Sequence, residues 1–396
     1  MPRLPLPWLF TAAGAALFAG HGLAAAARLR RLGALTPSRP TGEAQAALPP
    51  EVSVVRPVHG GGRAALDGLE SWLRLEEARD VEFVFAFQEP DDPVLRALPA
   101  LRRRHPRRRI RAVVAPVEPG YTGKGANLLH GVAAARGRFL VLADADMVAA
   151  PGALLALVEP LRRPGGERTA VSAVPVHRGA RGLWGLLYQT HMNATVLAEW
   201  LPWAGRLDVG APGAAVALRR SLLEGIGGVP AFGRHINDDV RLGQLVRRAG
   251  GRIVLGPLLL SPVGRKSRAQ LESLLARGAL IFRRMLPAHL QAVHHLVHYA
   301  YLPMAALGLG DRRWLQAAGL YLLAKMGLSA WVARRIGEPP LPAALAVPLL
   351  DAASWLAEAR TLRRGRLRWG GLEYRADGAG RLAVPAGHDP ARHETR

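Results

Sequence analysis

The chain has 396 residues, 49% of them hydrophobic, with a formal net charge of +23 and a mean hydropathy of +0.08. It contains no cysteine, which excludes disulfides, thiolate catalysis and cysteine-ligated zinc. The basic residues form short arginine clusters beside apolar segments, without an aromatic RNA-binding or zinc-finger signature, so the composition favours anionic lipid headgroups over nucleic acid as the partner.

The first element is an apolar run, Leu4–Ala27. At about 1.5 Å per residue it can cross a hydrocarbon core of ~30 Å, which predicts a transmembrane anchor over residues 1–30. A cleaved signal peptide is the alternative, because small residues are frequent near the end of the run. The arginines that follow predict that this side, and hence the catalytic domain, faces the cytoplasm. Residues 31–50, rich in proline and small residues, predict a linker.

Short apolar strands then alternate with helical stretches. This alternation predicts an α/β domain over residues 51–270 with a parallel sheet, in which ligands bind at the carboxyl ends of the strands. The expected strands are Val52–Val55, Val81–Phe87, Arg111–Ala115 and Phe139–Ala143, and the helices between them include Ala64–Leu73 and Ala126–Ala135.

An Asp-Ala-Asp sequence ends the last of these strands. Residues two apart on a strand point to the same side, so the carboxylates of Asp144 and Asp146 are expected to converge. Mg²⁺ and Mn²⁺ prefer oxygen ligands, commonly one or two carboxylates together with substrate phosphates. The pair therefore predicts a site for a divalent cation and a nucleotide diphosphate. The alternative is a polar strand end that complements the amides of a helix beginning near Pro151.

A second acidic cluster, Asn237–Asp239, precedes the helical pattern Val240–Arg248. Asn237 or Asp238 would make a good helix N-cap, worth ~1 kcal/mol. A carboxylate of this cluster, Asp238 or Asp239, could serve as a general base.

Two further positions suit a nucleotide. Asp91 and Asp92 follow the second expected strand, where a carboxylate can accept hydrogen bonds from uracil or ribose, although aspartate also favours plain turns. Lys124 lies in a glycine-rich turn before a helix whose first amides can face an anion. A solvated loop lysine is the simpler interpretation.

The C-terminal part predicts an amphipathic interfacial segment over residues 271–290, a membrane region over residues 291–359, and a basic, partly mobile tail over residues 360–396. With the N-terminal anchor, the protein is expected to have three or four membrane spans. The C-terminal candidates are Leu290–Leu309, which contains three histidines and is the weakest, Trp314–Val332 and Leu341–Leu356.

Six short motifs occur in order at Gln88–Pro93, Gly123–Leu128, Ala143–Asp146, Ile236–Asp239, Met285–Ala288 and Gly365–Gly371. In this order they resemble the ceramide glucosyltransferases and their bacterial relatives among glycosyltransferase families 2 and 21, including hopanoid-associated lipid glycosyltransferases. The resemblance runs from about Val52 to Gly371. It implies a GT-A nucleotide-sugar domain, a UDP-sugar donor, a lipid acceptor and inversion at the anomeric carbon.

The resemblance also implies roles for single residues. It implies that Asp239 is the base and that donor binding involves Asp91, Asp92, Lys124, Asn127 and Asp144.

The family's Gln/Arg-x-x-Arg-Trp element is reduced in this chain. It aligns with Leu274–Gly278, where only Arg277 survives. Arg277 suits bidentate contacts with diphosphate oxygens. A lipid-facing arginine, or an alignment shifted to Arg283 and Arg284, is the alternative.

The sequence thus predicts a membrane-bound, metal-dependent inverting glycosyltransferase that moves a hexose or N-acetylhexosamine from a UDP-sugar to a lipid hydroxyl. A processive β-glycan synthase is one alternative, but it should have a longer transmembrane channel and an intact Arg-Trp element. A catalytically inactive, basic membrane scaffold is the other.

Overall fold

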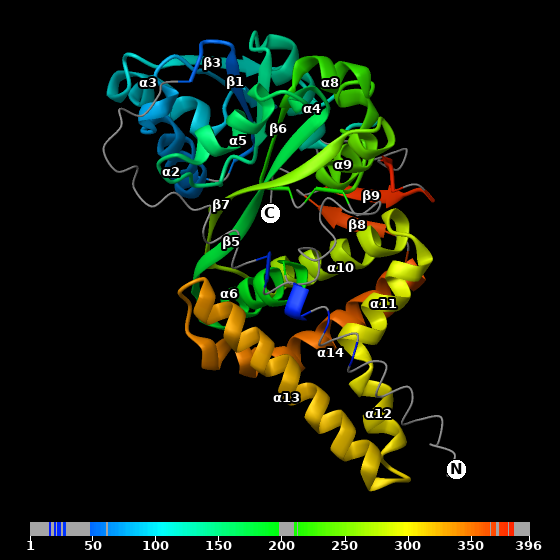
Figure 1. Ribbon diagram of the computed structural model, residues 1–396. Coiled ribbons are helices and arrows are strands. Elements are labelled where there is room, and N and C mark those ends of the chain that lie inside the picture. Colours follow the sequence, from blue (N-terminus) through cyan, green and yellow to red (C-terminus); the bar gives the residue numbers. More distant parts are fainter. Residues whose placement is uncertain are drawn as a thin grey trace. The chain divides into compact units, whose positions relative to one another are not determined.

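Figure 1 shows a computed structural model of the chain, which divides into two compact units. The sheet unit comprises residues 31–177, 204–262 and 365–396, and the helical unit comprises residues 1–30, 178–203 and 263–364. This grouping is discontinuous in sequence, unlike the contiguous ranges that we predict. Most of the predicted anchor and most of the predicted linker lie outside the described residues. The structure describes isolated positions between 16 and 28, and then residues 48–60, 62–197, 210–211, 213–364, 366–369, 372–378 and 380–383.

The sheet unit is built on seven strands in the order β3-β2-β1-β4-β6-β5-β7 (Figure 1). All four predicted strands are present, and the α/β part of the prediction is confirmed. The strands are β1 (Val52–Val58), β2 (Glu82–Phe87), β3 (Arg109–Val114), β4 (Phe139–Ala143), β5 (Thr169–Arg181), β6 (Ala215–Arg219) and β7 (Arg252–Arg265).

The parallel arrangement is confirmed for the four predicted strands but does not extend to the whole sheet. β3, β2, β1 and β4 are parallel neighbours, but β6 is antiparallel to both β4 and β5. β4 and β5 therefore run in the same direction, joined through helix α5, and β6 is inserted between them. The alternation of strands and helices predicts that strands joined through a helix run parallel. It does not predict that a later strand, here β6, lies between two earlier ones.

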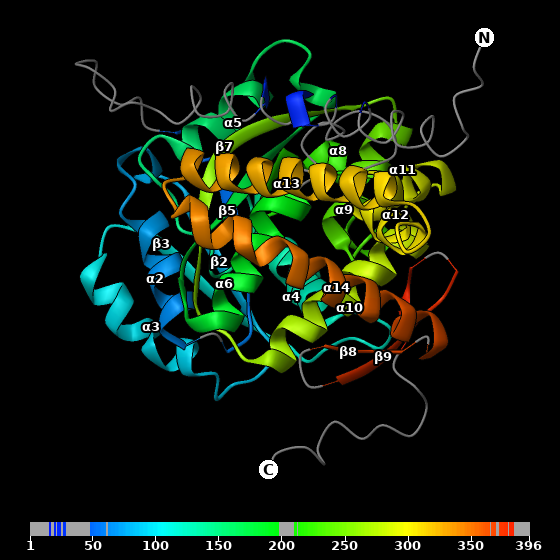
Figure 2. The ribbon, with the colours of Figure 1, turned by 90° about the horizontal axis from the view of Figure 1, so that it is seen from below.

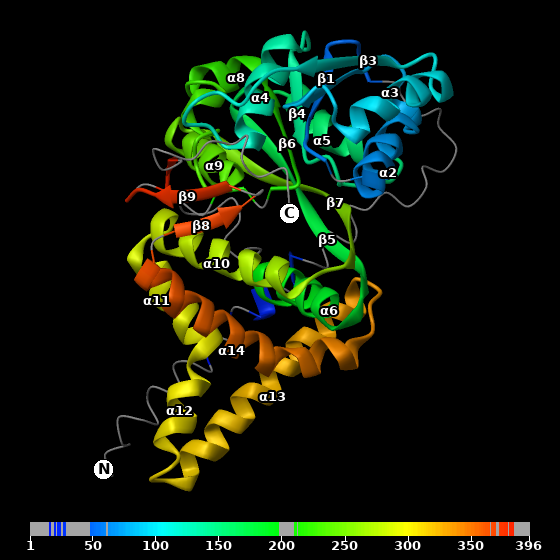
Figure 3. The same cartoon turned by 180° about the vertical axis from the view of Figure 1, so that it is seen from behind.

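Helices cover both faces of this sheet (Figure 3). Alternate strand residues point into two cores: Val54 and Val141 face α2, α3 and α5, whereas Val55 and Leu140 face α4, α8 and α9. β1, β2 and β4 are buried on both faces and are therefore mainly apolar, which is why the sequence predicts them well, whereas β3 is more exposed. The helices are α2 (Gly62–Leu73), α3 (Pro93–Arg104), α4 (Gly123–Ala134), α5 (Ala153–Arg162), α8 (Arg220–Gly225) and α9 (Asp238–Arg248).

The helical unit contains the predicted C-terminal segments (Figure 2). Trp314–Val332 lies within α13 and Leu341–Leu356 within α14, whereas Leu290–Leu309 is divided between α11 and α12. α10 and α6 pack on α14 through leucines such as Leu187, Leu274 and Leu350. The elements are α6 (Gly182–Thr190), a π-helix (His191–Leu197), α10 (Arg268–Met285), α11 (Ala288–Tyr299), α12 (Tyr301–Leu307), α13 (Arg312–Arg335) and α14 (Pro340–Arg364).

Among the described residues, one helical segment is long and apolar enough to cross a membrane. It is Pro340–Thr361 of α14, with 22 residues and a mean hydropathy of 1.3. Length and composition alone support it, so the predicted multi-pass topology stays a prediction.

The predicted tail contains more regular structure than its composition suggested. Three short strands form a second sheet in the order β10-β9-β8. Backbone hydrogen bonds tie its last part to the segment before α9, from Ile236 to Gly380 and from Leu382 to Arg234. The strands are β8 (Arg366–Trp369), β9 (Leu372–Ala376) and β10 (Leu382–Ala383).

Candidate active site

The Asp-Ala-Asp turn lies at the carboxyl end of β4, as predicted. The amide of Asp144 donates to the carbonyl of Ala214 (3.0 Å), and the amide of Met147 donates to the carbonyl of Asp144 (3.2 Å). Ala214 has φ 61°, and no other non-glycine residue in the described ranges has a positive φ. Such strain costs about 1–3 kcal/mol and tends to occur at functional sites. Here it allows Ala214 to hold the turn from the neighbouring strand.

Lys124 joins this turn to the second acidic cluster. Its Nζ lies 2.8 Å from Oδ1 of Asp144, 3.0 Å from Oδ2 of Asp238 and 3.1 Å from Oδ2 of Asp239. The lysine side chain is 22% exposed and that of Asp144 33% exposed, so the cluster remains open to a ligand. Asp146 is half-buried in the same turn. The structure therefore brings the predicted residues Asp144, Asp238 and Asp239 together around Lys124.

Lys124 is positioned by the N-terminus of α4. The hydroxyl of Thr122 caps this helix by accepting a hydrogen bond from the amide of Gly125 (2.9 Å). A side chain at Gly125 would collide with the backbone of Gly233, so only glycine allows this approach. The cap and the close packing fix the first turn of α4, which carries the lysine.

The two acidic residues beyond the turn belong to the first turn of α9. Asn237 is its N-cap and accepts a hydrogen bond from the amide of Val240 (3.0 Å), which confirms the capping role predicted for this position. Asp238 and Asp239 follow, where carboxylates also complement the helix dipole. Gly213, at φ 90°, leaves room for Asp239, because a Cβ there would lie 2.9 Å from the carboxylate Oδ2.

The crowding of carboxylates shifts two pKa values in this cluster. Burial and the neighbouring charge of Asp238 raise the pKa of Asp239 to about 7, although Lys124 partly opposes this. Burial disfavours the charge on Lys124, but Asp144, Asp238 and Asp239 outweigh it and hold its pKa well above the usual range. Lys124 is therefore a permanent cation, and Asp239 is a carboxylate able to exchange a proton near neutral pH.

The sequence model of glycosyl transferase family 21 matches residues 14–382. The chain belongs to glycosyltransferase family 21. This confirms the family expected from the six motifs.

Three solved structures illustrate more distant similarity. The mannosyltransferase PcManGT from Pyrobaculum calidifontis, in complex with GDP-Man and Mn²⁺, is 20% identical, with 89% of this chain and 99% of that chain covered and a TM-score of 0.48. S. aureus TarS 1-349 is 11% identical, covering 86% and 98%, with a TM-score of 0.35. Glucosyl-3-phosphoglycerate synthase from Mycobacterium tuberculosis, in complex with Mn²⁺, UDP-glucose and phosphoglyceric acid, is 19% identical, covering 57% and 77%, with a TM-score of 0.34.

The residues present fit a divalent cation in this family 21 protein. Asp144 and Asp146 would hold it, and the excess of carboxylates over the single ammonium of Lys124 favours a second positive charge. Within the ranges that the structure describes, no group of three or more histidine or acidic side chains forms a ready-made metal site. The cation would thus need further oxygen ligands from the donor diphosphate.

The other predicted donor residues make structural contacts. Asp92 accepts hydrogen bonds from the amides of Gly60 (2.7 Å) and Val94 (2.8 Å), and so caps α3 and fastens the loop after β1. Asp91 beside it is exposed. Asn127 is buried and its amide nitrogen donates to the carbonyl of Val58 (2.8 Å). Asp92 and Asn127 therefore shape the same strand end, whereas Asp91 presents a carboxylate to solvent.

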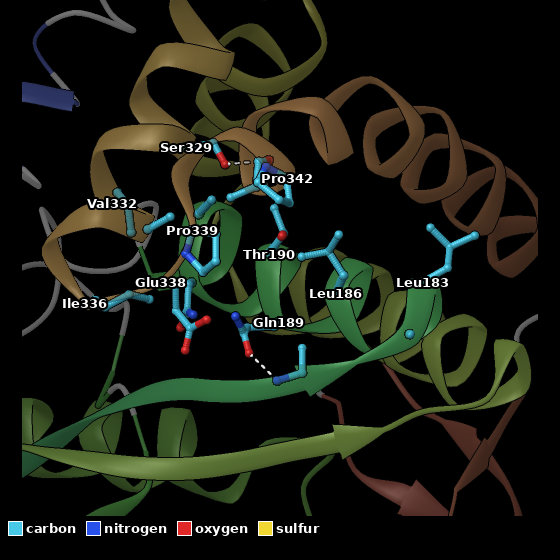
Figure 4. A pocket seen from close by; sticks show the side chains of 16 residues that line it. Leu183, Leu186, Gln189, Thr190, Ser329, Val332, Ile336, Glu338, Pro339 and Pro342 are labelled. Atoms are coloured by element: carbon cyan, nitrogen blue, oxygen red, sulfur yellow. Dashed lines mark hydrogen bonds between the residues drawn. The ribbon is translucent and has the colours of Figure 1, made fainter.

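Arg277 lies on α10 in the helical unit, with its side chain half-buried. The same unit has a pocket of about 300 Å³ between α6 and the α13–α14 connection (Figure 4). Apolar side chains such as Leu186 and Val332 line it. Of its polar groups, Gln189 accepts from the amide of Ala180 (2.9 Å) and Ser329 donates to a backbone carbonyl (3.0 Å). Such a lining suits an apolar ligand segment better than a nucleotide.

Two features of the site were missed by the sequence reasoning. The close approach of Gly213 to Asp239 could have been suspected from the glycine-rich segment that precedes β6. The second is Arg56, a basic residue within the apolar strand β1, which contacts the Asp-Ala-Asp turn. A charged residue in a strand that is buried on both faces was a signal in the sequence.

Proposed function

We propose that this family 21 glycosyltransferase is a metal-dependent, inverting enzyme that transfers a hexose or N-acetylhexosamine from a UDP-sugar to a hydroxyl group on a lipid. The observation that carries the proposal is the contact of Lys124 with Asp144, Asp238 and Asp239. It brings the N-terminal turn of α4, the Asp-Ala-Asp turn and the first turn of α9 into one cluster, and we propose that these bind the phosphates, bind the cation and supply the base, respectively.

The donor is held through its phosphates. Lys124 and the amide end of α4 offer positive charge to the diphosphate, and Asp144 and Asp146 would hold the divalent cation. When bound, that cation supplies Lewis-acid stabilisation of the leaving diphosphate. The ligands that we propose for this chain are thus a UDP-sugar and a divalent cation, Mg²⁺ or Mn²⁺.

The transfer is proposed to be a single displacement. The acceptor oxygen attacks the anomeric carbon, a new carbon–oxygen bond forms, and the bond from that carbon to the diphosphate breaks as UDP leaves. The carboxylate of Asp239 takes the proton of the acceptor hydroxyl, for which a pKa of about 7 is well matched. Asp238 supports the base by holding Lys124 in place (3.0 Å). The configuration inverts because no protein nucleophile intervenes.

The surface of the helical unit supports the proposal of membrane attachment. Four leucines of α14 are exposed at helical spacing, namely Leu341, Leu345, Leu349 and Leu356. Exposed leucines also occur on α13, at Leu320 and Leu323. Large exposed apolar surfaces are typical of membrane contact, and arginines at the end of α13 suit anionic headgroups. We propose a membrane location with the sheet unit on the cytoplasmic side.

A radiolabel transfer assay tests this function. The full-length protein in detergent is given Mg²⁺ or Mn²⁺, a panel of UDP-sugars and a panel of lipids with free hydroxyls. Asp239→Asn should reduce transfer by about 10²- to 10⁴-fold, because the base is lost, and EDTA should remove activity. The control is Asp67→Asn, which alters a half-exposed aspartate on α2 and should be fully active.

Other outcomes of the assay would favour a different function or a different catalytic residue. A polymer in place of a single-sugar glycolipid would favour the processive synthase. Full activity of Asp239→Asn would show that another group is the base. No binding of UDP or metal by the parent protein would favour the inactive scaffold.

A further inference from the structure

Arg56 lies directly beneath the Asp-Ala-Asp turn. It is on β1, with 0% of its surface exposed. Its Nη2 donates to the carbonyl oxygens of Asp144 (2.6 Å), Ala145 (2.9 Å) and Met147 (3.1 Å). One side-chain nitrogen thus contacts nearly every carbonyl of the turn.

Helix α2 holds the same turn from a second direction. The indole nitrogen of Trp72 donates to the carbonyl of Met147 (2.9 Å), and its ring lies 5.0 Å from Cζ of Arg56. A side chain at Gly68 would collide with the carbonyl oxygen of Ala145. The guanidinium is therefore stacked on one side and hydrogen-bonded on another, and the turn has little freedom to shift.

Burying Arg56 in this arrangement reduces the stability of the folded state. Among the described residues, Nε and Nη1 of Arg56 have no hydrogen-bond partner, and burying a charge with unmet donors is strongly unfavourable. Burial lowers the pKa of Arg56 to about 9, against the raising effect of Asp146 and Asp144, so the side chain stays charged at neutral pH. Packing alone would be served better by an apolar residue of similar size.

We propose that Arg56 is a positioning residue that holds the turn so that the carboxylates of Asp144 and Asp146 converge on a divalent cation. Its hydrogen bonds fix the backbone that carries both carboxylates, and its charge reduces their mutual repulsion before the cation arrives. This inference rests on the proposed metal dependence.

The test measures Mn²⁺ binding by the full-length protein in the presence of UDP, from the electron paramagnetic resonance signal of free Mn²⁺. Changing a residue behind a metal ligand typically weakens metal affinity by about 10- to 100-fold. Arg56→Met should fall in that range. Arg56→Lys, which keeps the charge but not the planar fork, should lose less.

A second variant reaches the turn without touching the arginine. Gly68→Ala should displace the carbonyl of Ala145 and weaken Mn²⁺ binding in the same direction. Its matched control is Gly225→Ala on α8, where an added Cβ meets nothing within 4 Å, and which should bind Mn²⁺ like the parent. If Arg56→Met does not unfold cooperatively, the Mn²⁺ affinities of Arg56→Lys and Gly68→Ala test the positioning role instead.

The outcomes separate the two proposals. If the parent binds Mn²⁺ and the folded variants bind it equally well, the positioning role is overturned and metal dependence stands. If the parent does not bind Mn²⁺ even with UDP, the proposed metal dependence fails, and the role of Arg56 fails with it.

Discussion

Two lysines in this protein are paired with aspartate, but in contrasting environments. In the sheet unit, Lys124 faces three carboxylates and is 22% exposed. In the helical unit, Lys325 faces the single carboxylate of Asp351 at 2.5 Å, with side chains 7% and 4% exposed. Tyr301 and the carbonyl of His298 complete this second pair.

The difference lies in whether the charges cancel. The Lys325–Asp351 pair is neutral, closed and hydrogen-bonded, as expected of a contact that fixes neighbouring helices. The Lys124 cluster keeps a surplus of negative charge and an opening to solvent, which is what a site for a cation and a diphosphate needs. Surplus charge together with exposure, more than the presence of an ion pair, marks the functional cluster.

The largest effect on stability is expected at the closed pair. Lys325→Met leaves Asp351 buried without its partner, which should cost about 3–5 kcal/mol of unfolding free energy. The double variant Lys325→Met, Asp351→Leu should recover most of this loss, because no charge remains. Thermal unfolding in detergent measures both. Lys266→Met, at the chain's remaining lysine, is the control, and an equal loss in the double variant would contradict a paired role.

At the Lys124 cluster we expect a large effect on donor binding and a smaller effect on stability. Lys124→Met should raise the KM for the UDP-sugar by about 10- to 100-fold, because a hydrogen bond to a charged group is worth about 1.5–3 kcal/mol. Its unfolding free energy should change less than that of Lys325→Met, since water and cations can reach the carboxylates. Steady-state kinetics beside the same melting experiment provide the measurement. A variant that unfolds readily but binds donor normally would remove the contrast between the clusters.

The sequence predicted this site where the signal was local. Apolar runs buried on both faces identify β1, β2 and β4, and Asp144 follows from the end of such a run. Lys124 was recognisable beside the glycines at the start of α4. That Asp144 and Asp239 lie in one site could be predicted only from the family resemblance, because no local pattern relates the end of β4 to the start of α9.

Long-range contacts set the limits of that prediction. The insertion of β6 between β4 and β5 depends on packing that no strand pattern encodes. The hydrogen bonds of Arg56 join β1 to a turn far along the chain, so the sequence marked the residue as unusual without naming its partner. The short strand β8 has two arginines among four residues and lies in an arginine-rich segment, so the sequence suggested a solvated tail there.

The smallest effect, and the sharpest test of the open cluster, is in the pH dependence. Asp239 must lose its proton to act as base, so kcat/KM should rise with pH through about 7, the pKa that burial and Asp238 impose. Lys124→Met removes the charge that opposes this shift, so the midpoint should move to higher pH. A pH–rate profile of the parent and of Lys124→Met measures this midpoint. The same pKa also affects stability: because it lies above the value of 3.8 for an ordinary aspartate, the folded state holds the proton more tightly, and this carboxyl should lower the unfolding free energy as pH rises from about 4 to about 7. A midpoint that stays unchanged or falls in Lys124→Met would mean that Asp239 does not sense the lysine, and that the contact at 3.1 Å does not tune the base.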